Sequence, residues 1–566
     1  MDPMDATPSA TAMTVIPDHR STPPLLTMPI EILTRISHHL NTTDFCNVRL
    51  TCRGLEQALF NDFADDFFSR KQFMISEFSL GALIDIAKSR LGWTMKHVNL
   101  SVDHITLATN AISFLGEEQQ RYCHAYRAQQ INLWSTGLVH DLLAEAFRHL
   151  PNLESVVIRD FNSYTRHRDG PKKAWKSYGA KIMRDTCGVE PVTNYETGHY
   201  MGYQVDYAGQ LFTAVLKSLG TVDARPKSIK IYERRGNRLQ DTAFYIPRAI
   251  EAKVLPVLNN LTELHLCIRE IPSSIQHNSI NYLYLRKFLA HCSNLEILRL
   301  NSHFDNYDMI ERDCLKSLQL WLAAPPPRPA QHLKITLSFG FMSTTTDDLL
   351  AILTKFAPTL KRLELWKVIL GAKDPQNDDR IARANICLWT RFFRKLLAIP
   401  GLDINEILLG FLRQYGSGVP SSLSTMPNIR FIKTTAFIEE DASIRVMDEL
   451  KYRGEDIKDF ISGITMMFNA DWVTYEDWRQ RSNGEILFEL FTLCYQHHDI
   501  WDTKRIEAND EAVAALNDPE AQDGETELDI AASKREAEKY IHRVRVDEDA
   551  LVPEQDESNL FGLGFF

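Results

Sequence analysis

Histidine and cysteine are the residues of this chain that could most readily serve catalysis or bind a metal ion. His38-His39 and His497-His498 are adjacent pairs, and neighbouring residues of a helix point in different directions rather than toward one ion. No motif places a histidine base beside Cys52, so packing explains this thiol better than nucleophilic catalysis does. The glycine-rich phosphate loops, the His-Glu-x-x-His zinc motif and the Gly-x-Ser-x-Gly motif are all missing from the sequence. We therefore expect no catalytic residue, no metal site and no cofactor, and we do not predict an enzyme.

A basic segment, residues 159–184, could bind a phosphate group, for example in a phosphorylated peptide. Gly170-Pro171 interrupts it and no periodicity organises it, which favours an exposed insertion in the fold instead. Its basic side chains are Arg166, Arg168, Lys172, Lys173, Lys176 and Lys181, and they alternate with the aromatic rings of Tyr164, Trp175 and Tyr178.

The segment from Leu25 to Phe60 has the pattern of short, consecutive helices. Pro29 is suited to a first helical turn and Glu31 to the positive end of a helix dipole, and the polar residues 41–44 can cap a second helix. The apolar residues that recur at helical spacing are Ile32, Leu33, Ile36, Leu40, Phe45, Val48, Leu50, Cys52, Leu55, Leu59, Phe60, Phe63 and Phe67. They predict three helices with more than one apolar face. Because a unit of about 40 residues can hide little of its own surface, we expect it to dock on a partner or on a neighbouring domain.

These residues resemble the F-box, and in particular the F-box proteins of filamentous fungi. Met28 stands where the family usually has leucine, a substitution of similar volume. The residues that carry the resemblance are Leu25, Leu26, Pro29, Glu31, Ile32, Leu33, Leu40, Asp44, Phe45, Arg49, Cys52 and Arg53.

The resemblance implies that the F-box binds the Skp adaptor of a cullin-RING ubiquitin ligase. The residues that it implies at this contact are Leu26, Pro29, Ile32, Leu33, Ile36, Leu40, Leu50 and Cys52. Helical periodicity leaves an alternative open, namely that the same apolar residues pack on the rest of this chain.

Leu-x-x-Leu-x-Leu pieces recur after this segment and predict strands of a repeat array. Helix-like stretches and turns with Pro-Asn, Asn-Asn or Ser-Asn precede several of them, but the period is irregular. The regular frames begin at Met95, Leu153, Leu261, Leu295 and Leu360, and looser ones contain Ile229 and Ile231, Leu333 to Leu337, Ile404 to Leu409, and Ile429 with Ile432. The pattern is similar to the degenerate leucine-rich repeats that often follow an F-box. We predict an α/β protein with an N-terminal three-helix F-box and an irregular leucine-rich-repeat-like α/β solenoid. An α/β domain of another topology is the alternative.

In such an array, one residue of each frame points out of the inner face of the sheet. This row is the predicted substrate-binding surface, although solvated strand residues would give the same pattern. Its members are Asn99, Val157, Lys230, His265, Arg299, Thr336 and Glu364.

Composition limits the classes of function. The net charge of -11 argues against a general nucleic-acid binder, since such binding needs many basic phosphate contacts. The chain contains no run of about 18 apolar residues, so we predict no membrane span. Its nine cysteines form no close pairs, which is typical of a reducing compartment, and we expect a cytoplasmic or nuclear protein.

The predicted organisation has four parts: a disordered tail at residues 1–24, the F-box at 25–70, the repeat domain at 71–500 and an acidic helical or disordered tail at 501–566. The predicted function is a substrate-receptor subunit that binds the Skp adaptor and a cullin scaffold on one side and an unknown protein target on the other. The alternative is a ligase-independent repeat scaffold with a vestigial F-box.

Overall fold

The computed structural model divides the chain into two compact units. One consists of Met1–Ser69 and Asn162–Trp175, and the other of Arg70–Phe161 and Lys176–Phe566. We call them the box unit and the sheet unit. The structure describes residues 24–102, 115–161, 168, 176–188, 207–233, 238–269, 282–303, 316–324, 336–340, 342–371, 388–414, 430–434, 444–447, 449–454 and 457–469. Residues 1–23 of the predicted N-terminal tail, the whole tail at 501–566 and half of the basic segment, residues 162–167 and 169–175, therefore lie outside the described residues.

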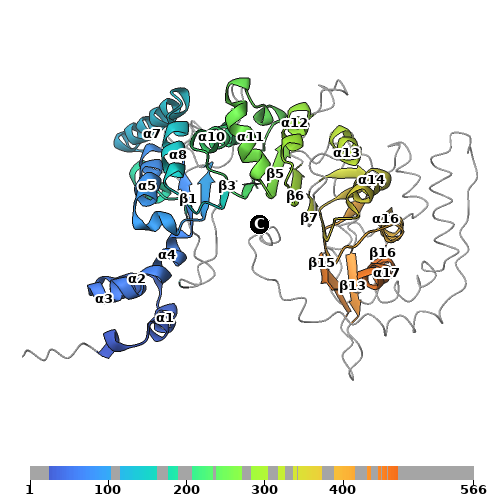
Figure 1. Ribbon diagram of the computed structural model, residues 1–566, viewed down its shortest axis with the longest axis horizontal. Helices are drawn as coiled ribbons and strands as arrows, with labels where there is room; N and C mark the ends of the chain where they lie inside the picture. The colour runs from blue at the N-terminus through green and yellow to red at the C-terminus, as the bar shows by residue number, and fades with distance from the viewer. Residues whose placement is uncertain are drawn as a thin grey trace, which may run out of the picture. The chain divides into compact units, whose positions relative to one another are not determined.

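Short helices make up the box unit (Figure 1). The Asn41 side chain caps the second α-helix by accepting a hydrogen bond from the Asp44 amide at 2.9 Å, as the polar turn predicted. The expected third helix is divided in two, because Leu59 leaves the helical conformation with φ -96° and ψ 6°. The helices are η1 (Pro24–Thr27), α1 (Ile30–His38), α2 (Thr42–Leu50), α3 (Arg53–Ala58) and α4 (Phe60–Phe68).

A ten-stranded sheet organises the sheet unit, and its strands lie side by side in the order of the chain. All neighbouring pairs are parallel except the last, in which β15 is antiparallel to β11. The strands are β1 (Arg70–Met74), β2 (His97–Ser101), β3 (Ser155–Arg159), β4 (Ser228–Tyr232), β5 (Glu263–Arg269), β6 (Ile297–His303), β7 (Thr336–Gly340), β9 (Arg362–Trp366), β11 (Glu406–Gly410) and β15 (Glu449–Arg453).

The predicted strand frames agree with this order except for the last one. Ile432 lies in β13 (Arg430–Thr434), which pairs with β14 (Ile444–Met447) and β16 (Phe468–Asn469) in a separate antiparallel sheet. The edge strands β1 and β15 carry no leucine frame and were not predicted. A further small parallel sheet consists of β8 (Ser343–Thr345), β10 (Ile369–Gly371) and β12 (Arg413–Gln414).

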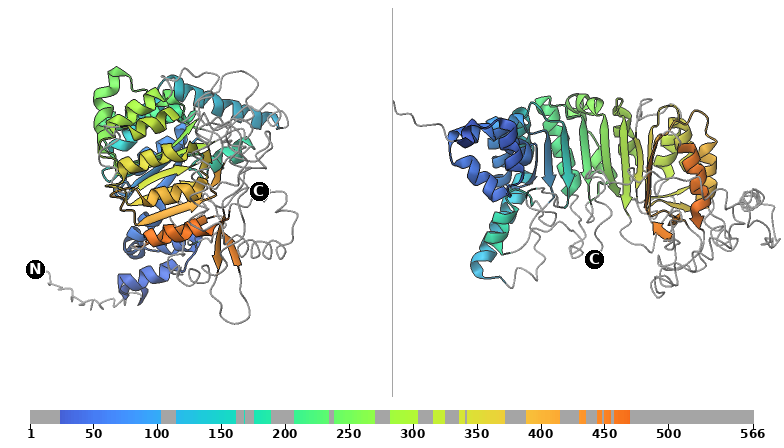
Figure 2. Two further views of the ribbon diagram at one scale, coloured as in Figure 1. Left: turned by 90° about the vertical axis from the view of Figure 1, so that its right-hand side faces the viewer. Right: turned by 90° about the horizontal axis from the view of Figure 1, so that it is seen from below.

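Helices join successive strands, and most of them cover one face of the large sheet (Figures 1 and 2). Cys123 of α7 and Ala180, Met183 and Cys187 of α9 instead form a small separate cluster with Met74 of β1. Alternate strand residues such as Leu264, Leu298 and Leu363 point to this face and are fully buried in one hydrophobic cluster. The connecting elements are α5 (Glu77–Lys88), η2 (Arg90–Trp93), α7 (Glu117–Ser135), α8 (Leu138–Arg148), α9 (Ala180–Cys187), α10 (Tyr207–Val222), η3 (Asp241–Phe244), α11 (Arg248–Asn260), α12 (Leu283–His291), α13 (Lys316–Ala323), α14 (Thr346–Phe356) and α16 (Leu388–Leu397), and α17 (Ile457–Met467) follows the last strand of the sheet. None of the helices in the described ranges combines the length and apolarity needed to cross a lipid bilayer.

Asparagines in the turns before the strands connect one turn to the turn before the previous strand. Asn152 Nδ2 donates to the carbonyl of Trp93 at 2.7 Å, and Asn260 Nδ2 donates to that of Arg225 at 2.9 Å. Asn294 Nδ2 donates to the carbonyl of Asn259 at 2.7 Å. The Pro-Asn, Asn-Asn and Ser-Asn signals of the sequence are therefore hydrogen-bonding positions that satisfy turn carbonyls.

Candidate functional site

Packing within the box unit separates its apolar side chains into an internal core and an exposed set. The core contains Leu33, Phe45, Leu55, Leu59 and Phe67. The Phe45 and Phe67 rings are stacked with centroids 6.2 Å apart. This core places α1, α2 and α4 around aromatic side chains, and it leaves Ile32 and Ile36 of α1 and Leu50 of α2 on the surface.

Three isoleucine and leucine side chains form the main exposed set on α1 and α2. Ile32 is 43 % exposed, Ile36 is 42 % exposed and Leu50 is 69 % exposed. Ile32 and Ile36 are four residues apart and so lie on the same side of α1. Full burial of such a side chain is worth roughly 1.5 to 3 kcal/mol, so covering the exposed half of each would contribute about 1 kcal/mol. This surface suits a protein partner.

The other residues predicted to face a partner lie at different depths. Pro29 is exposed, whereas Leu26, Leu40 and Cys52 are half-buried. Leu33 corrects the prediction, because it is 6 % exposed and belongs to the internal core. Sequence reasoning also missed three exposed apolar residues beside this surface: Leu25, Met28 and Ile30. Their apolar type was visible in the sequence, but they precede the regular helical spacing that was used.

A second candidate surface lies on the sheet face that the hydrophobic cluster does not occupy. We call it the polar ladder, because polar side chains from successive strands pair across it. Its members are Lys230, Tyr232, Glu263, His265, Arg299, Ser338, Arg362, Glu364, Glu406 and Lys451.

At one end of the ladder, His265 is held between two partners. Its Nε2 lies 3.0 Å from Glu263 Oε1, and its Nδ1 lies 2.7 Å from the Tyr232 hydroxyl. The contacts suit a neutral ring that donates from Nε2 and accepts at Nδ1. Glu263 also forms an ion pair with Lys230, whose Nζ lies 2.8 Å from Glu263 Oε2.

Burial lowers the pKa of His265 to about 4, and the nearby charge of Arg299 acts in the same direction. Burial works to raise the pKa of Glu263, but the hydrogen bonds and charges of His265 and Lys230 outweigh it and lower the pKa to about 2. At neutral pH the histidine is therefore neutral and the carboxylate charged.

At the other end of the ladder, carboxylates bridge arginines of neighbouring strands. Glu364 pairs with Arg299, and its Oε1 lies 2.5 Å from Arg362 Nη2. Arg362 Nη1 also lies 3.3 Å from Glu406 Oε1, which lies 3.8 Å from Lys451 Nζ. Burial works to raise the pKa of Glu364, but the charges of Arg299 and Arg362 outweigh it and lower the pKa.

The row predicted for substrate binding corresponds to this face, with one correction. Asn99, Val157, Lys230, His265 and Arg299 follow one another in register. The next place belongs to Ser338 and not to Thr336, because the apolar pair of β7 is Leu337 and Phe339. Among the predicted residues, Lys230 is partly exposed, whereas the buried ones are Asn99, Val157, His265, Arg299, Thr336 and Glu364. Glu263 and Arg362 were missed, although they lie two residues before the chosen His265 and Glu364 and so share their face. Glu406 was missed because no residue of β11 was chosen.

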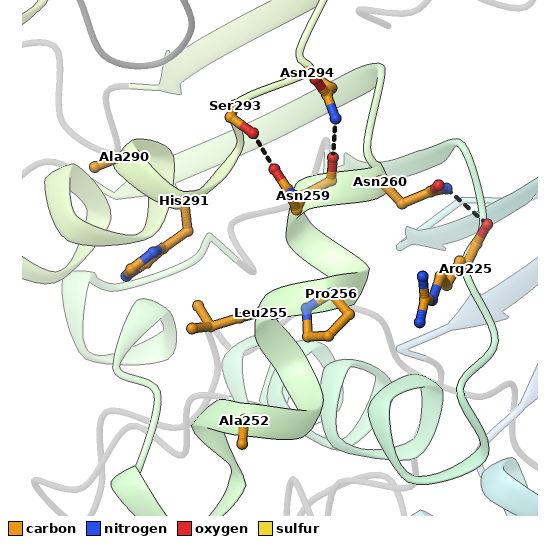
Figure 3. Close-up of a pocket in the computed structure, with 10 residues that line it drawn as sticks. All are labelled: Arg225, Ala252, Leu255, Pro256, Asn259, Asn260, Ala290, His291, Ser293 and Asn294. Atoms are coloured by element: carbon orange, nitrogen blue, oxygen red, sulfur yellow. Dashed lines mark hydrogen bonds between the residues drawn. The ribbon is translucent and has the colours of Figure 1, made fainter.

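A shallow groove of about 700 Å³ lies beside the turns that follow α11 and α12 (Figure 3). Leu255 and Pro256 are among its apolar lining residues, and Arg225 and His291 are among its polar ones. The hydrogen bonds drawn there belong to the asparagine turns. Across the described ranges, no group of histidine, cysteine, aspartate and glutamate side chains could hold a metal ion.

A small helical unit with exposed apolar side chains is typical of a protein-docking module. That module is an F-box domain: the family model described as "F-box domain" matches residues 25–62. No curated protein matches the chain.

Among solved structures, one described as "Crystal structure of Rad7 and Elc1 complex in yeast" is similar to this chain. It has 12% sequence identity and a TM-score of 0.20, and the match covers 63% of this chain and 84% of that chain. A TM-score of this size carries no argument about the fold or the partners of this chain.

Proposed function

We propose that this protein is the substrate-receptor subunit of a Skp-cullin-F-box ubiquitin ligase. The F-box domain at residues 25–62, with Ile32, Ile36 and Leu50 left uncovered, is the observation that carries the proposal. F-box domains bind Skp-type adaptors, and F-box proteins are generally adaptors and not enzymes. Other subunits would perform ubiquitin transfer, while this chain raises the local concentration of the target.

On this proposal, the adaptor covers the exposed side of α1 and α2. Ile32, Ile36 and Leu50 contribute apolar area, and Pro29 lies at the start of the same helix. Leu33 contributes by holding α1 on the core, since its side chain is already buried. A substitution that tests the contact must therefore change an exposed residue and leave Leu33 intact.

We further propose that the sheet unit is a leucine-rich-repeat-like solenoid that recruits the protein target on its polar ladder. The order of the parallel strands and the asparagine turns support this interpretation. The accessible cations of the ladder are Lys230, Arg362 and Lys451, whose side chains are 24 %, 26 % and 25 % exposed. A cytoplasmic or nuclear location would accompany this role.

Co-purification tests the proposal. The full-length chain is expected to capture both the Skp adaptor and a cullin, and the Ile32→Glu/Ile36→Glu variant is expected to lose both. Leu320→Glu is the matched control, because it removes an exposed aliphatic residue of α13 in the sheet unit. Capture of the adaptor without any cullin would favour the ligase-independent scaffold, and capture that survives the double substitution would contradict the proposed surface.

Target recruitment has its own test. Lys230→Gln and Lys451→Gln remove charge from partly exposed ladder positions without replacing the buried His265 or Arg299. We expect proximity labelling by these variants to lose the target proteins that the wild-type chain labels, in particular those whose labelling increases when the ligase is inhibited. An unchanged set of labelled proteins would contradict recruitment on the ladder, while adaptor capture would be unaffected.

A further inference from the structure

Arg168 lies far from the F-box segment in sequence, yet its side chain is bound among F-box residues. The contact with Asp66 of α4 spans 102 residues of the chain. Nε of Arg168 donates to Asp66 Oδ2 at 2.7 Å, and Nη2 lies 2.6 Å from the same oxygen. Only 8% of the Arg168 side chain is exposed, so this is not an ordinary surface ion pair.

Two further helices of the box unit contribute to this site. Nη1 of Arg168 donates to the carbonyl of Ser37 near the end of α1 and to that of Leu40, 3.4 Å away, in the turn before α2. The guanidinium carbon lies 4.0 Å from the ring centroid of Phe45 in α2. A cation is favoured at these carbonyls, where the negative end of the α1 dipole lies, and over an aromatic face.

We propose that Arg168 is a positioning residue for adaptor binding, and this inference rests on the proposed function of the F-box. One guanidinium joins the end of α1, the middle of α2 and the side of α4, so it sets the angle at which α1 and α2 meet. The exposed Ile36 and Leu50 belong to those two helices. The F-box of this chain is therefore completed by a residue outside the segment that the family pattern covers, residues 25–62.

The contacts call for arginine in particular. A guanidinium is planar, can lie flat on the Phe45 ring and can direct separate N–H groups to Asp66 and to the two carbonyls. A lysine ammonium is a compact charge on a flexible chain and would keep the attraction to Asp66 but not the flat stacking. Arg168→Lys should therefore restore part of what Arg168→Ala loses.

Two measurements on the full-length protein test the proposal: amide hydrogen exchange and affinity for the purified Skp adaptor. In Arg168→Ala we expect exchange in Thr42–Leu50 to accelerate at least about tenfold, the effect of losing one hydrogen bond to a charged group. Exchange in β5 and β6 should stay unchanged. Adaptor affinity should fall by a similar factor, with partial recovery in Arg168→Lys. Arg148→Ala, which removes an exposed arginine of α8, is the matched control and should change neither.

A double-mutant cycle with Asp66→Asn distinguishes positioning from general loss of folding. The two substitutions should be less than additive in their effect on adaptor affinity, because both remove the same contact. Fully additive effects, or an affinity unchanged in Arg168→Ala despite faster exchange, would overturn the positioning role and leave the proposed function standing. Failure of the wild-type chain to bind the adaptor would instead refute the proposed function, and unchanged exchange in Arg168→Ala would refute the contact itself.

Discussion

The neutral, buried ring of His265 should make the sheet unit lose stability as the pH falls. The pKa of His265 is lowered from 6.5 to about 4 in the folded chain. As the pH decreases between these values, the unfolded chain binds a proton at this residue and the folded chain does not, so folding stability decreases. Between about pH 7.5 and about pH 5, this difference amounts to about 2 kcal/mol.

His265→Gln removes the titration but keeps a donor for Glu263 and an acceptor for Tyr232. Urea unfolding of the full-length chain should therefore show that the free energy of unfolding falls by about 2 kcal/mol more in the wild type than in the variant over this pH interval. His124→Gln, at an exposed position of α7, is the control for histidine replacement. An equal pH dependence in the wild type and His265→Gln would refute a neutral, buried His265.

Three smaller predictions follow from other contacts and can be checked by urea unfolding. Asn260→Ala should cost about 1 kcal/mol, because the carbonyl of the preceding turn loses its hydrogen bond; an unchanged midpoint would contradict a role in the turn. Gly220→Ala should cost about 1 to 3 kcal/mol, since its Cβ would lie 2.6 Å from the Lys253 carbonyl oxygen; a neutral result would show that α10 and α11 can separate. Leu33→Ala should cost about 2 to 5 kcal/mol, whereas Ile32→Ala should cost less than about 1 kcal/mol; equal losses would contradict the division into core and surface.

The strands of the large sheet could be predicted because their buried side chains repeat at fixed positions within a short frame. Leu261, Leu264 and Leu266 show why: the side chains that meet the helices are apolar and buried, so each such strand carries the same short pattern. The edge strand β1 was missed because it lacks the leucine frame. Thr336 was predicted in place of Ser338 because the apolar frame of β7 was taken two residues too early in the sequence.

The candidate surfaces were harder to predict than the strands. Helical spacing predicts that both Leu33 and Ile36 lie on an apolar side of α1. Only the packing of the short helices decides which of the two side chains is buried. The contacts of Arg299 with Glu364, and of Arg168 with Asp66, join residues far apart in the chain. No local pattern encodes such pairs, since each residue alone is compatible with a solvated charge.

Calorimetric titration of the full-length chain with the purified Skp adaptor tests the central claim most directly. The uncovered side of α1 and α2 should give saturable one-to-one binding with a negative heat-capacity change, as expected for burial of apolar surface. Ile36→Glu should weaken that binding by about tenfold or more, while Leu320→Glu leaves it unchanged. An affinity that Ile36→Glu does not alter, or the absence of any binding by the folded wild-type chain, would contradict the claim.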